Sequence, residues 1–214
     1  MLTSRTGNVS PIPQPRTPSD PRDLRKALGQ FATGVTVVSY YADGEARGAT
    51  VNSFTGISLD PPLILVSLAR SARTSGALAH CSFVVNVLAR DQLDLAMHFA
   101  GRPQKGLADP WLKSEKAPRL KDCVAYFGCE PWRSVEAGDH IVFFGRVLEY
   151  HHENEPCLAF HQGEFRVLGE TLNGLKAVVP LDGRPVLRWL EARHQLVDLA
   201  EEGVRLFASD DLLL

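Results

Sequence analysis

The segment from Gly48 to Leu68, GATVNSFTGISLDPPLILVSL, constrains the fold more than any other part of the chain. Its first half places hydroxyl and amide side chains between apolar ones, as in a strand with one polar face. Its second half, Leu63 to Leu68, is a continuous apolar run of the length of a buried strand. Asp60-Pro61-Pro62 lies between the halves, and two prolines supply no ladder N–H groups and fix φ. We therefore predict a polar-studded strand, a tight stop and a buried strand.

The polar side chains of the first half suit a flat ligand whose edge carries hetero atoms. They are short hydroxyls and an amide, namely those of Thr50, Asn52, Ser53, Thr55 and Ser58. A structural interpretation competes with this one, because serine and threonine in strands commonly bond to backbone groups or water. Both interpretations stay open on this segment alone.

Further strand signals favour an antiparallel barrel. Val35 to Tyr41 is β-branched and aromatic, and Asp43-Gly44 predicts a hairpin to the next strand. Short helices are expected after Asp20, an N-cap followed by Pro21, and again near Thr74. Hairpin-linked strands with only short helices between them indicate a barrel instead of a parallel sheet. The other predicted strands are Phe83 to Leu88, Lys121 to Trp132 (ending at Glu130-Pro131), Asp139 to Tyr150 and Cys157 to Phe160.

Composition bounds the class of protein. The chain has 214 residues, 44% hydrophobic and 22% charged, which suits one globular domain with extensions. A net charge of −2 with scattered Lys and Arg argues against nucleic-acid binding, and no apolar stretch is long enough to cross a bilayer. The four cysteines form no CxxC pair and no secretory signal precedes them, so we expect reduced thiols and a cytoplasmic protein. The predicted organisation is a flexible arm (1–19), a main domain (20–170) and an extension with one helix (171–214).

Ser71-Ala72-Arg73-Thr74 directly follows the buried strand and opens a helix. Two hydroxyls, a guanidinium and free N–H groups at a helix start suit a phosphate. The alternative is an ordinary N-cap with an exposed arginine. Placed after the polar strand, the segment suggests one ligand with a ring at one end and a phosphate at the other.

His140, at the mouth of a strand, could hydrogen-bond a cofactor, although most single histidines are structural. Strand alternation predicts that Asp139 and His140 point to opposite faces, so Asp139 is not expected to orient the imidazole. Neither GxGxxG nor GxxxxGK[ST] occurs in the chain, and Cys157 with His161 makes a poor zinc site, so we expect no metal.

Taken as an ordered set, these motifs resemble the short-chain flavin reductases, the reductase components of two-component flavin monooxygenases. The resemblance covers about Asp23 to Glu170. It implies a homodimeric FMN-binding split β-barrel that uses NADH or NADPH to reduce FMN or FAD and releases reduced flavin to a separate monooxygenase. The matching segments are Phe31-Ala32-Thr33-Gly34-Val35-Thr36-Val37-Val38, Gly48 to Phe54, Ser58 to Leu63, Ser71 to Thr74, Phe83 to Leu88, and Gly138-Asp139-His140 with Gly145 and Val147.

The resemblance also implies residue roles, with hydride passing from the nicotinamide to flavin N5. His140 would act beside the flavin and the nicotinamide, which Phe165 would also contact. Phe160 stands where many relatives have tyrosine, so a hydroxyl role there is lost. Two alternatives remain, a flavin-containing reductase of another acceptor such as a corrinoid, and a non-catalytic flavin-binding or partner-docking protein. The implied flavin-binding residues are Thr36, Thr50, Val51, Asn52, Ser53, Ser67 and Leu68, with Ser71, Arg73 and Thr74 at the phosphate.

Overall fold

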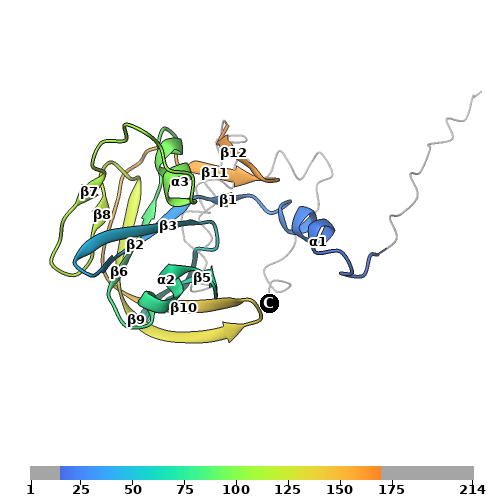
Figure 1. Ribbon diagram of the computed structural model, residues 1–214, viewed down its shortest axis with the longest axis horizontal. Helices are drawn as coiled ribbons and strands as arrows, with labels where there is room; N and C mark the ends of the chain where they lie inside the picture. The colour runs from blue at the N-terminus through green and yellow to red at the C-terminus, as the bar shows by residue number, and fades with distance from the viewer. Residues whose placement is uncertain (1–14, 170–214) are drawn as a thin grey trace, which may run out of the picture.

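The computed structural model describes residues 15–169, and strands dominate this part of the chain, as predicted (Figure 1). Most of the predicted arm (1–19) and the whole predicted extension (171–214) lie outside the described residues. The helices are α1 (Pro21–Leu28), α2 (Arg73–Leu78) and α3 (Leu93–Phe99). The main sheet contains β2 (Thr36–Ala42), β3 (Glu45–Val51), β4 (Thr55–Leu59), β5 (Pro62–Ala69), β6 (Phe83–Val87), β9 (Ala125–Ala137) and β10 (His140–His152). A smaller sheet contains β1 (Thr33–Gly34), β11 (Leu158–His161) and β12 (Glu164–Val167), and β7 (Trp111–Leu112) pairs with β8 (Arg119–Leu120).

The order of strands in the main sheet is β3-β2-β6-β9-β10-β5-β4, and every pairing is antiparallel. The hairpin predicted at Asp43-Gly44 is confirmed, because it joins β2 to β3 with φ of 54° and 77° at its two central residues. Positive φ at both positions is what the tight hairpin turn favoured by strand twist requires.

The predicted polar strand is in fact two strands at opposite edges of the sheet. β3 ends at Val51 and β4 begins at Thr55, so the three residues Asn52-Ser53-Phe54 link the two edge strands. We call these three residues the crossing segment. Because β3 also contacts β5, the sheet curls and its two edges approach each other. The sequence predicted the polar and buried halves correctly but missed this break.

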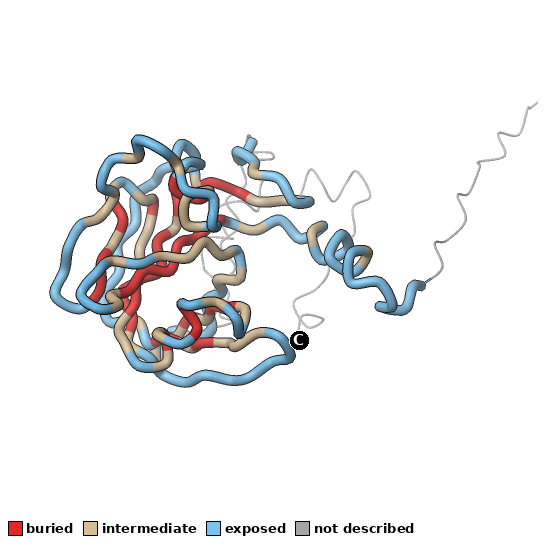
Figure 2. Tube along the Cα trace, viewed as in Figure 1, coloured by how far each residue is buried: buried red, intermediate tan, exposed pale blue. Residues whose placement is uncertain are grey.

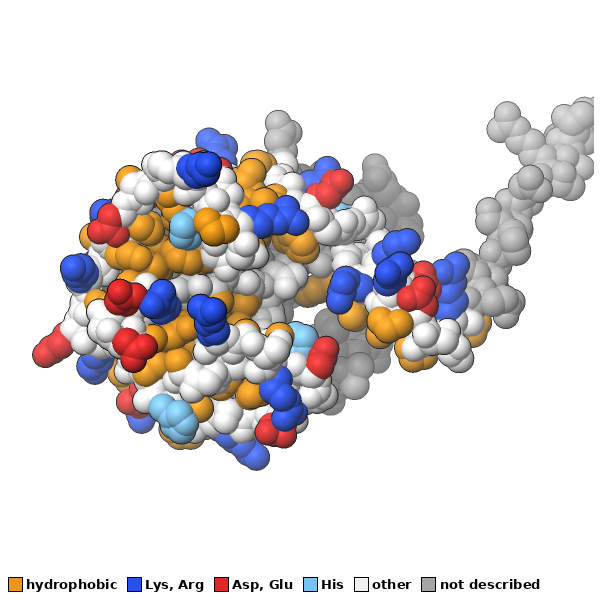
Figure 3. Space-filling view, in the orientation of Figure 1, with side chains coloured by type: hydrophobic (Ala, Val, Ile, Leu, Met, Phe, Trp, Pro, Cys, Tyr) orange, Lys and Arg blue, Asp and Glu red, His pale blue; other side chains and the backbone are white. Residues whose placement is uncertain are grey.

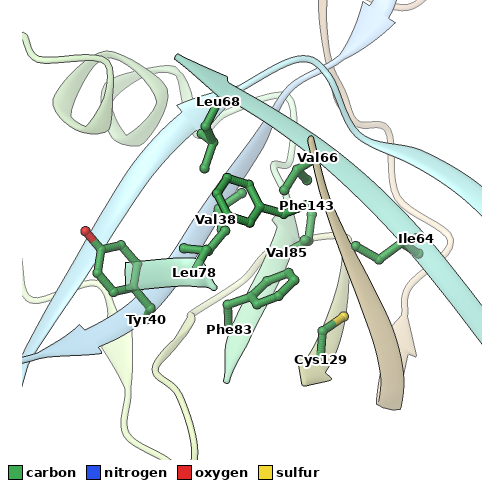
Figure 4. Close-up of a cluster of buried hydrophobic side chains, with 10 residues drawn as sticks. All are labelled: Val38, Tyr40, Ile64, Val66, Leu68, Leu78, Phe83, Val85, Cys129 and Phe143. Atoms are coloured by element: carbon green, nitrogen blue, oxygen red, sulfur yellow. The ribbon is translucent and has the colours of Figure 1, made fainter. Parts of the chain in front are cut away.

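Two apolar clusters make the core, on opposite faces of β2. The buried residues lie mainly along the strands of the main sheet (Figure 2). The first fills the curl of the sheet, where Val38, Phe83 and Phe143 point toward one another (Figure 4). The second packs Val37 against Leu95 and Ala96 of α3. Gly145 in β10 is buried against the first cluster, since an added Cβ would lie 2.6 Å from Cζ of Phe83.

A buried asparagine ties three parts of the fold together. Asn86 of β6 is fully buried, and its Nδ2 donates to the carbonyl of Val37 and to Oγ of Ser39, each at 2.9 Å. Its Oδ1 accepts a hydrogen bond from the backbone N–H of Leu120 at 2.8 Å. The side chain therefore satisfies buried backbone groups of β2 and β8 that have no access to water.

The predicted end of a strand at Glu130-Pro131 is wrong, because β9 continues to Ala137. Pro131 pairs with Gly145 and Arg133 with Phe144, so Trp132 is an extra residue at a bulge. β6 pairs with β9 only as far as Cys129, so the proline removes no N–H that a second neighbour needs. Beyond this point β9 is held by β10 alone.

α1 begins after Asp20, whose carboxylate accepts from the N–H of Arg22 at 2.8 Å, as predicted. The helix ends at Leu28, and its apolar side chains are not buried. Leu28 is 67% exposed and Phe31 79% exposed, and the helix stands out from the body of the protein (Figures 1 and 3). No helix within residues 15–169 combines the length and apolar character needed to cross a membrane.

Candidate functional site

The crossing segment is fastened to the end of β5 by a serine side chain. Oγ of Ser53 donates to the carbonyl of Ser67 at 2.8 Å and accepts from the N–H of Ser67 at 2.9 Å. Thr55 pairs with Leu65 in the β4–β5 ladder, so Ser53 and Ser67 are the next two residues in register. The hydroxyl of Ser53 thus replaces the backbone partner that Ser67 would have if the β4–β5 ladder continued. Ser53 and Ser67, both predicted site residues, are thus brought together.

The predicted residues on β2 and β3 do not form one row of side chains. Thr50 donates its hydroxyl to the carbonyl of Ala96 in α3 at 2.8 Å, and Thr36 donates its own to the carbonyl of Val51 at 3.0 Å. Val51 packs toward the opposite face of the strand, against the first core cluster. Because β3 is an edge strand, alternate backbone N–H and C=O groups along it remain unpaired by the sheet. β3 therefore offers a ligand its backbone, and Asn52 adds an exposed amide.

The segment after β5 leaves a hydroxyl and a guanidinium free. The N-cap of α2 is Ala72 and no side chain caps the helix, so Ser71 is not the ordinary cap that the alternative required. Ser71 and Arg73 are exposed, and within residues 15–169 neither side chain makes a hydrogen bond or an ion pair. Thr74 differs, because it is buried and its Oγ1 lies 3.4 Å from the hydroxyl of Tyr40.

His140 starts β10 beside the same end of β5, where it pairs with Ala69. Its Nδ1 lies 2.7 Å from a carboxylate oxygen of Asp139, so the prediction that Asp139 does not orient the imidazole is wrong. Asp139 belongs to the two-residue turn Gly138-Asp139, where strand alternation does not apply. The hydrogen bond from His140, and then the charge of the imidazole, lower the pKa of Asp139. The carboxylate is therefore ionised at neutral pH and holds Nδ1.

Two predicted residues lie apart from this group. The side chain of Leu68 points into the core, 3% exposed (Figure 4). Phe165 lies on β12, where its ring packs against Phe160 at 5.3 Å between centroids. Leu68 can contact a ligand only through its backbone, whereas Phe165 is half-buried and keeps an open edge.

One polar atom near this region was missed by the sequence reasoning. Oγ1 of Thr33 in β1 is buried and has no hydrogen-bond partner within residues 15–169. Thr33 pairs with Phe160 in the smaller sheet. Unpartnered buried hydroxyls are rare, so this one is a candidate contact for a polar ligand. No pattern in the sequence distinguishes Thr33 from other strand threonines.

Residues 28–169, more than half of the chain, match the family described as flavin reductase like domain. The chain belongs to this family. A probable flavin reductase of Rhizobium meliloti (strain 1021) is 42% identical over 151 residues, which are 68% of this chain and 48% of that protein. The reductase component of a flavin-dependent trigonelline monooxygenase from Acinetobacter baylyi (strain ATCC 33305 / BD413 / ADP1) is 39% identical over 148 residues, 67% of this chain and 48% of that protein. The chain thus spans about half the length of both relatives.

A solved structure of the same family carries fragments of both cofactors. It is the Streptomyces globisporus C-1027 NADH:FAD oxidoreductase SgcE6 in complex with NAD and FAD fragments. It is 34% identical, covers 77% of this chain and 100% of its own, and superimposes with a TM-score of 0.68. This likeness establishes the split-barrel flavin reductase fold for the described part of the chain. The free backbone edge of β3, the unengaged Ser71 and Arg73, and the unpartnered Thr33 are compatible with a flavin.

Proposed function

We propose that this protein uses NADH to reduce a flavin and releases the reduced flavin to a separate monooxygenase. Family membership and the printed functions of the relatives support the proposal. The observation that carries it is the grouping at one end of β5: a serine-fastened crossing segment, a free guanidinium and a carboxylate-held imidazole. A flat ring, a phosphate and a nicotinamide would each find a partner there.

The division of roles follows from which groups are free. The edge of β3, the amide of Asn52, and Ser53 with Ser67 would border the flavin ring, with Thr36, Thr50, Val51 and Leu68 supporting it. Ser71 and Arg73 would hold the phosphate, because both are exposed and unengaged, while Thr74 would contribute mainly backbone. A guanidinium binds phosphate with charge-assisted, often paired hydrogen bonds.

Bound flavin would supply the hydride acceptor, and the chain would supply positions and hydrogen bonds. With Nδ1 of His140 engaged by Asp139, only Nε2 remains free to contact the nicotinamide or the flavin edge. Hydride transfer itself needs no general acid or base, so His140 acts as an orienting and electrostatic group. Phe165, on β12 of the smaller sheet, would contact the nicotinamide from that side.

Steady-state oxidation of NADH and NADPH, each with FMN and with FAD, tests the proposal. We expect NADH oxidation to depend on added flavin and to saturate with it, as for a substrate that is released. A yellow protein that is inert to both nucleotides would favour a flavin-binding scaffold. Turnover that requires a corrinoid in place of free flavin would favour the other alternative. The rates for these four combinations also show which flavin, FMN or FAD, and which nucleotide, NADH or NADPH, the protein prefers.

Substitution of His140 by alanine should raise the KM for NADH about tenfold, the loss of one contact to the nucleotide, with a smaller effect on flavin affinity. KM comes from initial rates and flavin affinity from fluorescence titration. His151→Ala is the matched control, because Nε2 of His151 also lies 2.7 Å from a carboxylate, that of Glu153, at the other end of β10. Equal losses in nucleotide and flavin binding for His140→Ala would reject the assignment.

We also infer that the protein is a homodimer. α1 exposes Leu24 and Leu28, and Phe31 is exposed three residues after the helix ends. This segment is attached to the body mainly through Gln162, which hydrogen-bonds Gly29 and Gln30. A protruding helix with large exposed apolar side chains is typical of a surface that packs on another subunit.

A further inference from the structure

Arg70, the last residue before the Ser71–Thr74 segment, hydrogen-bonds the Gly138-Asp139 turn. Its backbone N–H donates to the carbonyl of Asp139 at 2.9 Å. Its guanidinium donates through Nη2 to the carbonyl of Gly138 at 3.0 Å and pairs through Nη1 with the carboxylate of Glu136 at 3.2 Å. One arginine therefore contacts the turn and the strand before it at three points.

Apart from these contacts, the turn is held by the β9–β10 hairpin that it closes, whose last pair is Ala137 and His140. Residues 131–137 of β9 are all exposed, and β6 does not pair with β9 beyond Cys129. β10 is bound to β5 on its other side, but its ladder with β5 stops at the pair of His140 and Ala69. Gly138 and Asp139 lie just past that last pair. Beyond the end of the ladder with β5, it is Arg70 that ties this hairpin turn to the segment that follows β5.

We propose that Arg70 is a positioning residue for nucleotide binding, which keeps the Gly138-Asp139 turn in the conformation where Asp139 holds the imidazole of His140. The inference depends on the proposed function, because it assigns the turn to the site of the hydride donor. Arg70 lies next to Ser71, so the same arginine connects the nucleotide side of the site to the segment proposed for the flavin phosphate.

The neighbouring arginine shows by contrast that Arg70 is not a flavin ligand. The two terminal nitrogens of Arg70 are engaged by Gly138 of the turn and by Glu136 of β9, whereas Arg73 makes no hydrogen bond or ion pair within residues 15–169. Nor is Arg70 a major source of stability. Its ion pair with Glu136 is exposed at both ends, with side chains 49% and 73% accessible, and exposed pairs add little to folding.

The test compares Arg70→Gln and Arg70→Lys with the wild type. For Arg70→Gln we expect the KM for NADH to rise about threefold to tenfold, with flavin affinity and kcat within about twofold. Arg70→Lys keeps a charge near Glu136 and should recover part of the loss. Arg146→Gln is the matched control, because Arg146 pairs with Glu130 at similar exposure, 47% and 44%, at the other end of the β10–β5 ladder, and should leave KM unchanged.

A second readout does not need activity. The pKa of Asp139 is lowered mainly by its hydrogen bond with His140, with a smaller contribution from the charge of Arg25 on α1. If Arg70 acts by placing the turn, Arg70→Gln should raise the Asp139 pKa toward its usual value, measured by carboxyl ¹³C NMR. An unchanged titration, or an unchanged KM in an enzyme that oxidises NADH, would overturn the inference. A wild type that oxidises no NADH refutes the proposed function instead, and the titration still decides whether Arg70 places the turn.

Discussion

Replacement of Arg73 by alanine is expected to weaken flavin binding about 10- to 100-fold, the loss of one charge-assisted hydrogen bond of roughly 1.5–3 kcal/mol. The residue is exposed at the start of α2 and makes no other polar contact within residues 15–169. Its removal should therefore leave the fold intact, and the whole effect should fall on the ligand. Fluorescence titration of FMN and FAD measures it.

The controls separate charge from geometry. Arg73→Lys keeps the charge but not the paired donors, so it should retain part of the affinity. Riboflavin, which has no phosphate, should bind wild type and Arg73→Ala with the same affinity. If FMN also binds both proteins equally, Arg73 does not hold the phosphate.

The second large effect is expected on stability, at Asn86. Asn86→Leu keeps the size of the side chain but removes the buried hydrogen bonds of Asn86 with the N–H of Leu120 and the carbonyl of Val37. We expect a loss of about 3–5 kcal/mol in the free energy of unfolding, from two buried groups that lose their hydrogen bonds. Urea denaturation monitored by tryptophan fluorescence gives the value.

Asn52→Ala is the matched control for this asparagine. Asn52 is exposed in the crossing segment, so its loss should change stability by less than about 0.5 kcal/mol while reducing flavin affinity. Similar unfolding free energies for the two variants would show that the Asn86 network contributes nothing. A loss of flavin affinity confined to Asn86→Leu would contradict the role proposed for Asn52.

Local patterns predicted the elements whose conformation is decided by near neighbours. Asp43-Gly44 suits the positive φ angles of a tight turn and predicted the hairpin. Asp20-Pro21 predicted the start of α1. The break at Asn52 was hidden, because whether the chain stays in one ladder depends on which strands flank it. The same holds for Pro131, whose missing N–H matters only if a second strand needs it.

The candidate site shows the same limit. Ser53, Ser67, Ser71 and Arg73 were found as polar residues at strand ends, and the fold gathers them. The alternation of side chains along a strand predicted the wrong direction for Asp139, because this residue lies in the turn, one position before the β10 ladder begins. Arg70 carried no signal, since its partners are 66 to 69 residues away in the chain and two of them are backbone carbonyls.

The length of the crossing segment sets a limit on how this barrel can exchange its ligand. Four peptide steps from Val51 to Thr55 reach at most about 14 Å even when fully extended, so the two sheet edges cannot part further than that at this point. A reductase that delivers its flavin to another protein must nevertheless release it in every cycle. Under the proposed function, release of the flavin therefore cannot require the two sheet edges to separate widely at the crossing segment.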